Sequence, residues 1–227
     1  MAKASRFHKT LREEIIDTLR EEIIKGSLKP GQRISEVSIS EKFNISRTPV
    51  REALWQLESE GFITIIPRKG AVISTISEND IKDFYETRSL LEGYVAAQSI
   101  EKFTDNDIKK LNALNKKMES YHKKNDWRNF YKAHNDFHKI LIKNCENELL
   151  KNMLESVYKR FQRFRLTLTL LNKVEGSIEQ HWQIIDSIKN KDKDRLVEAI
   201  KENATYGSKI LIKDVLAETG DYKDPAE

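Results

Sequence analysis

The sequence predicts a mainly α-helical protein in two parts, with one β-hairpin near the end of the first part. Apolar residues recur at three- and four-residue intervals along most of the chain, and glycine and proline are scarce, at 8 and 4 residues. Only two adjacent β-branched runs interrupt this helical pattern. We therefore expect residues 1–76 to form three helices and a hairpin, and residues 77–216 to form an all-α antiparallel helical bundle. Residues 217–227 are expected to be a polar C-terminal tail.

The first two helices are separated by a tight turn. Residues 11–24 carry an amphipathic pattern, and Lys29-Pro30-Gly31 then breaks it. A short helix is expected at residues 35–43, with Val37, Ile39 and Phe43 as its packing residues. Residues 44–46 are a short connection, as a helix-turn-helix requires.

The third helix separates apolar and basic side chains onto different arcs. At about 100° per residue, Val50, Ala53, Leu54 and Leu57 share one arc, and Arg47, Thr48 and Arg51 share another. Either Ser46 or Thr48 suits the N-cap, and in the second case Pro49 takes the first helical position. Gly61 supplies a left-handed C-cap. Arginine binds phosphate or guanine bidentately, although an ordinary surface helix with solvated arginines has the same pattern.

Two β-branched runs at residues 62–66 and 71–73 flank Pro67-Arg68-Lys69-Gly70, which predicts a hairpin with a basic tip. A hairpin that directly follows such a helix is a wing. The first part is thus predicted to be a winged helix-turn-helix.

Residues 8–76 resemble the DNA-binding unit of GntR-family bacterial transcription regulators. The resemblance rests on Lys29-Pro30-Gly31, on residues 46–54 (SRTPVREAL) and on Glu60-Gly61, in matching order and spacing. It implies that operator DNA is contacted by the start of the third helix and by the wing. Carried over to this sequence, the implied DNA-binding residues are Ser46, Arg47, Thr48, Arg51, Arg68, Lys69 and Gly70. Val37 stands where many relatives have a further DNA-contacting arginine.

From Ser77 onward the pattern predicts helices only. Their expected ranges are 78–101, 104–123, 126–144, 147–171, 175–190 and 192–215. Residues 77–215 resemble the FCD-type effector-binding domain of the FadR subfamily of GntR regulators. The matching stretches are residues 84–92 (FYETRSLLE), residues 135–141 (NDFHKIL) and the helix that contains His181. The resemblance implies a small organic acid, and in many members a divalent metal, at the centre of the bundle.

Three histidines are candidate metal ligands from spacing alone. His134 and His138 are four residues apart on one helix, so they share a face, and His181 lies on a later helix. Histidines in a core or on a surface would show the same spacing. The family pattern maps the metal ligands to His134, His138, His181 and Asn203, with Zn²⁺ or Ni²⁺ as the expected ion. Two positions depart from it, because His134 replaces a carboxylate and Asn203 replaces a histidine. The site therefore either holds its ion through three histidines or has lost it.

Arg88 is the candidate effector-binding residue. It falls within an apolar stripe, and a charge directed into a bundle is costly unless it is paired. The residues allow two partners, an effector carboxylate or Glu92 four positions on. The resemblance favours the effector.

Composition is consistent with a DNA-binding regulator but does not identify one. The formal net charge is only +4, and the single cysteine, Cys145, excludes an intrachain disulfide. We expect no signal peptide and no membrane contact, and hence a cytoplasmic protein. The function predicted is a homodimeric transcription regulator, most often a repressor, that binds double-stranded operator DNA and responds to a small carboxylate. It is not expected to be an enzyme. Two alternatives are a metal-dependent hydrolase built on the three histidines and an architectural DNA-binding protein without a ligand.

Overall fold

The computed structural model describes residues 10–160 and 162–213, and the chain divides between Thr75 and Ile76 into two compact units. We call them the N-terminal unit and the helical unit, and each is described by itself. The predicted tail at residues 217–227 lies outside the described residues. Among the described residues, no helix is both long and apolar enough to span a bilayer.

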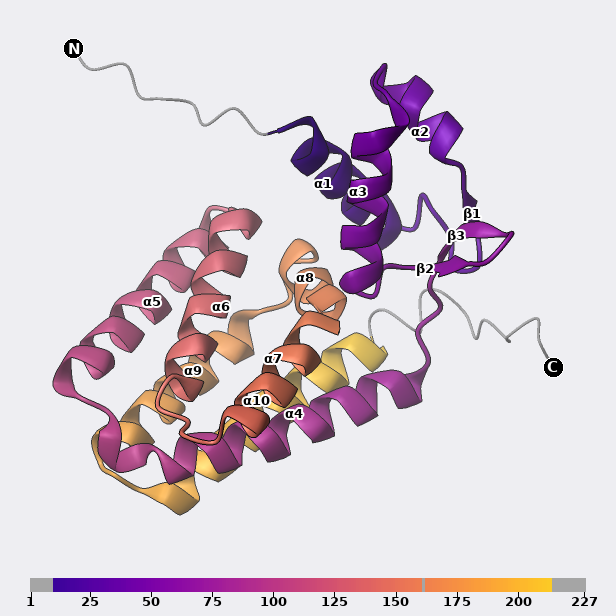
Figure 1. Ribbon diagram of the computed structural model, residues 1–227. Helices are drawn as coiled ribbons and strands as arrows, with labels where there is room; N and C mark the ends of the chain where they lie inside the picture. Colours follow the sequence, from indigo (N-terminus) through magenta and orange to yellow (C-terminus); the bar gives the residue numbers. More distant parts are fainter. Residues whose placement is uncertain (1–9, 161, 214–227) are drawn as a thin grey trace, which may run out of the picture. The chain divides into compact units, whose positions relative to one another are not determined.

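The N-terminal unit contains three helices and a small antiparallel sheet (Figure 1). Its helices are α1 (Leu11–Ile24), α2 (Glu36–Phe43) and α3 (Arg47–Ser59), and its strands are β1 (Arg33–Ile34), β2 (Ile63–Ile66) and β3 (Gly70–Ile73). The strand order is β1-β3-β2, with Arg33 opposite Val72 and Ile63 opposite Ile73. The predicted winged helix-turn-helix is confirmed, and the two-residue strand β1 is an addition that the sequence pattern did not indicate.

Burial follows the predicted helix faces. Ile15, Ile16 and Leu19 of α1 are buried, as are all four predicted apolar residues of α3, so these two helices share a core. Ile39 of α2 is buried, but Val37 is 41% exposed, so its prediction as a packing residue was wrong. Val37 lies in the first turn of α2, before the helix reaches the core.

A buried ion pair joins the first helix to the end of the third. Glu60 has no exposed surface, and its carboxylate accepts hydrogen bonds from both Nε and Nη2 of Arg20, the former at 2.8 Å. Gln56 Nε2 donates to the same carboxylate at 2.6 Å. After Glu60, Gly61 takes a φ of +79°, which confirms the predicted left-handed helix end.

The described part of the helical unit contains no strand. Its elements are α4 (Glu78–Gln98), the 3₁₀ turn η1 (Ile100–Lys102), α5 (Asp105–Lys123), α6 (Trp127–Ile142), α7 (Glu148–Arg160), α8 (Gln162–Leu170), α9 (Glu175–Lys189) and α10 (Lys193–Leu211). Ser77 begins α4 and Thr104 begins α5, each with a reciprocal capping box that satisfies end amides. In Figure 1, α4 and α10 run alongside each other, and α5 lies beside α6.

The single helix expected at residues 147–171 is two helices, α7 and α8. They differ in burial: α7 buries Leu154 and Tyr158, one turn apart, whereas α8 buries every residue from Arg163 to Thr169. A helix buried on all sides occupies the interior, so α8 brings its polar side chains into the core of the unit.

Candidate nucleic-acid interface and metal centre

The start of α3 presents its polar side chains to solvent. Ser46 is the N-cap, and Arg47, Thr48 and Arg51 are all exposed, while the opposite face is buried. Pro49 is the third residue of the helix, so the alternative in which Thr48 caps it was wrong. The Ser46 hydroxyl makes no capping hydrogen bond, and amides of the first helical turn lack intrahelical partners. Such a helix end favours an anion such as phosphate.

Arg51 is held by a residue that the sequence did not single out. Its Nε donates to Glu36 Oε2 of α2 at 2.9 Å, with the two side chains 60% and 35% exposed. This exposed pair is weak, but it fixes the plane of the guanidinium and leaves its outer nitrogens available. Glu36 adjoins Val37, so both lie at the start of α2.

The wing tip is a strained turn. Lys69 N donates to Ile66 O at 3.0 Å, and Arg68 has a φ of +65° in the third position of the turn. A type II turn with Pro67 in its second position prefers glycine there, so an arginine carries a conformational cost. Gly70, with a φ of +83°, begins β3 directly after the tip.

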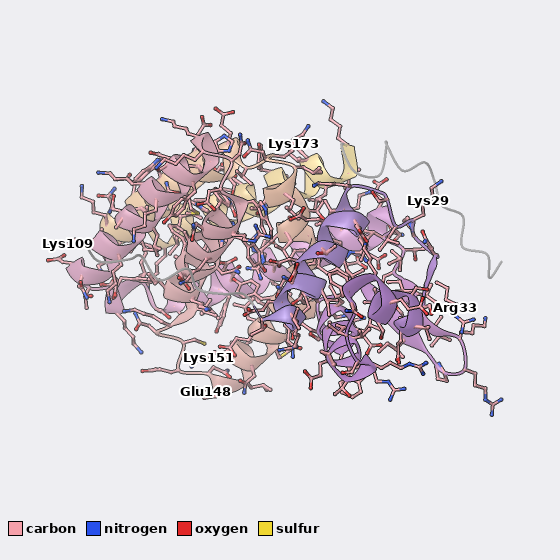
Figure 2. All side chains as sticks on the ribbon, turned by 90° about the horizontal axis from the view of Figure 1, so that it is seen from above. Lys29, Arg33, Lys109, Glu148, Lys151 and Lys173 are labelled. Atoms are coloured by element: carbon pink, nitrogen blue, oxygen red, sulfur yellow. The ribbon has the colours of Figure 1, made fainter. Side chains whose placement is uncertain are left out.

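Arg33 of β1 lies beside the three wing residues Arg68, Lys69 and Gly70. A Cβ placed on Gly70 would stand 3.7 Å from Arg33 Nε, so the Arg33 side chain lies against the wing. Figure 2 shows Arg33 and Lys29 at the outer side of this unit. Sequence patterns did not indicate a role for Arg33, because only the pairing of β1 with β3 brings it to the wing.

The helical unit brings three of the four predicted metal ligands together. His134 and His138 of α6 and His181 of α9 are all buried, and one ligand atom from each lies within 4.8 Å of the others. The ring centres of His134 and His138 are 4.6 Å apart, and those of His134 and His181 are 5.3 Å apart. A bound ion would lie about 2.0–2.1 Å from each nitrogen, so the three ligand atoms would have to close around it.

Two of these rings are oriented by buried acceptors. His138 Nδ1 hydrogen-bonds to Glu92 Oε1 on α4, and His181 Nδ1 lies 3.2 Å from Asn115 Oδ1 on α5. Asn115 Nδ2 donates to Ile178 O at 3.1 Å, which turns the Asn115 amide oxygen toward His181. Both Nδ1 atoms therefore carry the proton. The Nε2 lone pair of His181 is left for a ligand, whereas that of His138 faces Arg88 Nη2 at 3.4 Å.

The cluster fits a divalent transition metal. His181 Nε2 is buried without a hydrogen-bond partner among the described residues, an arrangement that a bound ion would satisfy. Burial lowers the pKa of His134 and of His181 well below the ordinary histidine value, with a further contribution from His138. Both rings are therefore neutral at pH 7, which is the state that binds metal.

Arg88 is buried beside the cluster and is paired through Nε and Nη2. Its Nε donates to Glu92 Oε2 at 2.9 Å, and its Nη2 lies 2.9 Å from Asn203 Oδ1 and 3.4 Å from His138 Nε2. Burial would lower the pKa of Arg88, but Glu92, together with Tyr158 and Tyr85, raises it above the ordinary arginine value. Burial would likewise raise the pKa of Glu92, but His138 and Arg88 hold it well below its ordinary value. The intrahelical pair with Glu92 is thus present.

Asn203, the fourth predicted ligand, is joined to the cluster through Arg88. Its amide oxygen accepts the Arg88 hydrogen bond, and its Nδ2 donates to Ser177 Oγ at 2.9 Å. Asn203 is 3% exposed, so both contacts are in the interior. In this arrangement the amide oxygen is engaged by a cation.

A cavity lies beside this network and is partly open to solvent. His134, Arg88 and Asn203 line it, so it reaches both the histidine cluster and the arginine. Arg165 of α8 and Lys173 also line it, and Lys173 lies at the surface (Figure 2). No aspartate or glutamate is among the described residues of its wall, so the cavity is suited to an anion.

Sequence patterns did not identify three contributors to this site. Glu92 was considered only as a partner of Arg88, and Asn115 and Arg165 were not selected, because their roles depend on which helices pack together. Tyr206 of α10 also lines the cavity, and its hydroxyl accepts a hydrogen bond from Gly176 N at 3.3 Å. A Cβ on Gly176 would overlap the Tyr206 ring, so this glycine permits the contact.

The chain is similar to bacterial transcription regulators over most of its length. Residues 11–73 match the family described as bacterial regulatory proteins, gntR family, and residues 83–205 match the FCD domain. YdhC of Bacillus subtilis, an uncharacterized HTH-type transcriptional regulator, is 28% identical over 186 residues, which are 80% of this chain and 82% of YdhC. The gluconate operon transcriptional repressor of the same species is 29% identical over 191 residues, covering 82% of this chain and 78% of the repressor.

Two further comparisons agree. The HTH-type transcriptional repressor RspR of Escherichia coli K12 is 26% identical over 194 residues, covering 84% of each chain. Among solved structures, E. coli McbR/YncC superposes with a TM-score of 0.67 at 22% identity, covering 92% of this chain and all of that one. The structural likeness supports the fold.

Proposed function

The chain belongs to the GntR family of bacterial regulatory proteins and carries an FCD domain in its helical unit, and from this premise we propose that it is a repressor controlled by a small carboxylic acid. The family consists of DNA-binding transcription regulators and not of enzymes, so the hydrolase alternative is set aside. Two relatives are named repressors, which supports the same sign of regulation here. A chromosomal regulator of this kind acts in the cytoplasm.

The start of α3 is proposed to enter the major groove of operator DNA. Ser46, Arg47 and Thr48 lie at its exposed end, and Arg51 follows one turn later. Arginines at such an end read guanine edges or hold phosphates. The wing residues Arg68, Lys69 and Gly70 are proposed to contact the neighbouring backbone or minor groove, and their strained turn supports a functional role.

Two copies are proposed to bind a palindromic operator as a homodimer. An exposed apolar patch on the helical unit supports this: Leu90 and Tyr94, one turn apart on α4, are 71% and 55% exposed. Val197 of α10 is 40% exposed and adjoins α4, since a Cβ on Gly93 would stand 3.6 Å from its Cγ1. Contiguous exposed apolar side chains mark association surfaces.

The effector is proposed to bind in the cavity of the helical unit. The observation that carries this proposal is that one cation-lined cavity reaches both Arg88 and His134 of the histidine cluster. His134, His138 and His181 would hold Zn²⁺ or Ni²⁺, which offers an open coordination position to a carboxylate. Glu92 and Asn115 fix the ring orientations, and Asn203 fixes Arg88 beside the cluster. Binding there would alter operator affinity through the coupling energy between the two sites.

Operator binding tests the DNA-contacting residues. The operator would be selected from a random duplex pool, and affinity measured by fluorescence anisotropy for the wild type, Arg47→Ala and Arg51→Ala. Each substitution is expected to cost about 1–3 kcal/mol of specific binding. Lys25→Ala, an exposed charge at the end of α1, is the control and is expected to bind as the wild type does. Unchanged affinity in both arginine variants would refute the assignment.

A further inference from the structure

Among the described residues, Arg165 has no carboxylate partner, unlike Arg88, the other buried arginine of the cavity. Its side chain is 7% exposed, and its partners among the described residues are the Tyr158 carbonyl, at 3.1 Å from Nη2, and the Tyr158 ring, 4.8 Å from Cζ. Its Nε is buried with no hydrogen-bond partner among those residues. Arg88, by contrast, is paired with a carboxylate, an amide and an imidazole.

A buried guanidinium without a carboxylate is costly, since it has lost hydration and gained only a carbonyl and a ring face. Arg165 lines the cavity, so an anion entering from solvent could pair with it there. Lys173 lines the same cavity near its surface and adds to the positive potential. Arg165, the arginine without a charged partner among the described residues, therefore lies on α8, whereas Arg88 lies on α4.

We propose that Arg165 forms a second acid-binding position in the cavity, so that the effector carries two acidic groups. One group would lie at the histidine cluster and Arg88, and the other would pair with Arg165. The second group is a carboxylate or a phosphate, because a guanidinium pairs bidentately with either. This inference rests on the proposed effector function and narrows its ligand to small diacids.

Matched acids test the second position by calorimetry on zinc-loaded protein. Malate and 3-hydroxybutyrate differ by one carboxylate, and phosphoglycolate and glycolate differ by one phosphate. We expect at least one diacid to bind about tenfold or more tightly than its monoacid partner, as charged hydrogen bonds are worth about 1.5–3 kcal/mol. The diacid that binds more tightly than its monoacid partner shows whether the second acidic group is a carboxylate or a phosphate. If neither diacid exceeds its partner, the proposal is overturned.

Arg165→Gln should remove this preference, bringing the diacid to the affinity of the monoacid without changing zinc content. Arg165→Lys keeps the charge and should retain part of the preference, which guards against a folding defect in the glutamine variant. Arg163→Gln is the matched control, because Arg163 is also buried on α8 but does not line the cavity, and it should keep the full preference. Undiminished diacid binding by Arg165→Gln would refute the inference. Operator binding without acid, measured alongside, tests the proposed function separately.

Discussion

Arg88 Nη2 donates to Asn203 Oδ1 over 2.9 Å, which links α4 to α10 beside the histidine cluster. The contact engages the amide oxygen that the family pattern would assign to a metal ion. It also makes Asn203 a support for Arg88, whose Nε donates to Glu92. The contact separates two roles of Asn203, metal ligand and support for Arg88, that the sequence could not distinguish.

Metal content distinguishes these roles. Asn203→Ala is expected to retain about one transition metal per chain, because the three histidines remain, whereas His181→Ala is expected to lose it. The metal content of Asn115→Ala should lie between those of the other two variants, since loss of an orienting acceptor lowers metal affinity by about 10–100-fold. Elemental analysis of proteins prepared without chelator or metal-affinity resin is the measurement. Loss of metal in Asn203→Ala equal to that in His181→Ala would make Asn203 a ligand.

Arg68→Gly is expected to change stability and DNA binding in opposite directions. Glycine relieves the positive φ of +65°, so thermal stability should be unchanged or rise by up to about 1 kcal/mol. Operator affinity should fall, and its salt dependence should weaken by about one phosphate contact. Calorimetric unfolding and anisotropy at several salt concentrations measure the two effects. Lower stability together with normal affinity would show that the arginine serves the turn and not the DNA.

Glu60→Gln is expected to destabilise the N-terminal unit by about 3 kcal/mol. The substitution leaves Arg20, 14% exposed, without its buried carboxylate. Glu21→Gln is the control, because the pair of Glu21 with Lys25 is exposed and contributes less than about 1 kcal/mol. Denaturant unfolding gives both values. Equal effects of the two substitutions would mean that the buried pair contributes no more than a surface pair.

Leu90→Glu is expected to convert the proposed dimer to a monomer. A charge in the Leu90, Tyr94 and Val197 patch would have to be buried on association without a partner. Sedimentation velocity reports the mass, and Leu11→Glu, at an apolar site on α1 that is 55% exposed, should leave it unchanged. A dimer that persists in Leu90→Glu would place the interface elsewhere.

Local patterns predicted the fold well because most of its helices are bounded by local signals. Ser77 and Gly61 act on their own neighbours in the chain, and the spacing of His134 and His138 places both on one helix face. Contacts between distant segments were not predictable. The bonds of Glu92 to His138 and of Asn115 to His181 join residues 46 and 66 positions apart. The same holds for β1, whose two residues become a strand only by pairing with β3.

The burial of α8 is the clearest case in which periodicity was insufficient. The sequence allowed Arg163 and Arg165 to line the bundle cavity but did not fix which way they face. In the structure both are buried, as are Thr167 and Thr169. Arg88 could be recognised because it falls within an apolar stripe, but no such stripe surrounds Arg165, and its partners are supplied by the packing of the helices. The sequence left the facing of Arg165 open, and the structure places it at the cavity.

Operator affinity measured with and without metal and acid tests the central claim most directly. Zinc-loaded and metal-stripped protein would each be titrated with a panel of small mono- and dicarboxylic acids on the selected operator. The account predicts that at least one acid changes affinity of the zinc-loaded protein by about 5–150-fold, and that stripping the metal abolishes the response. Affinity indifferent to every acid in both forms would contradict it and leave the helical unit a dimerisation module of an architectural DNA-binding protein.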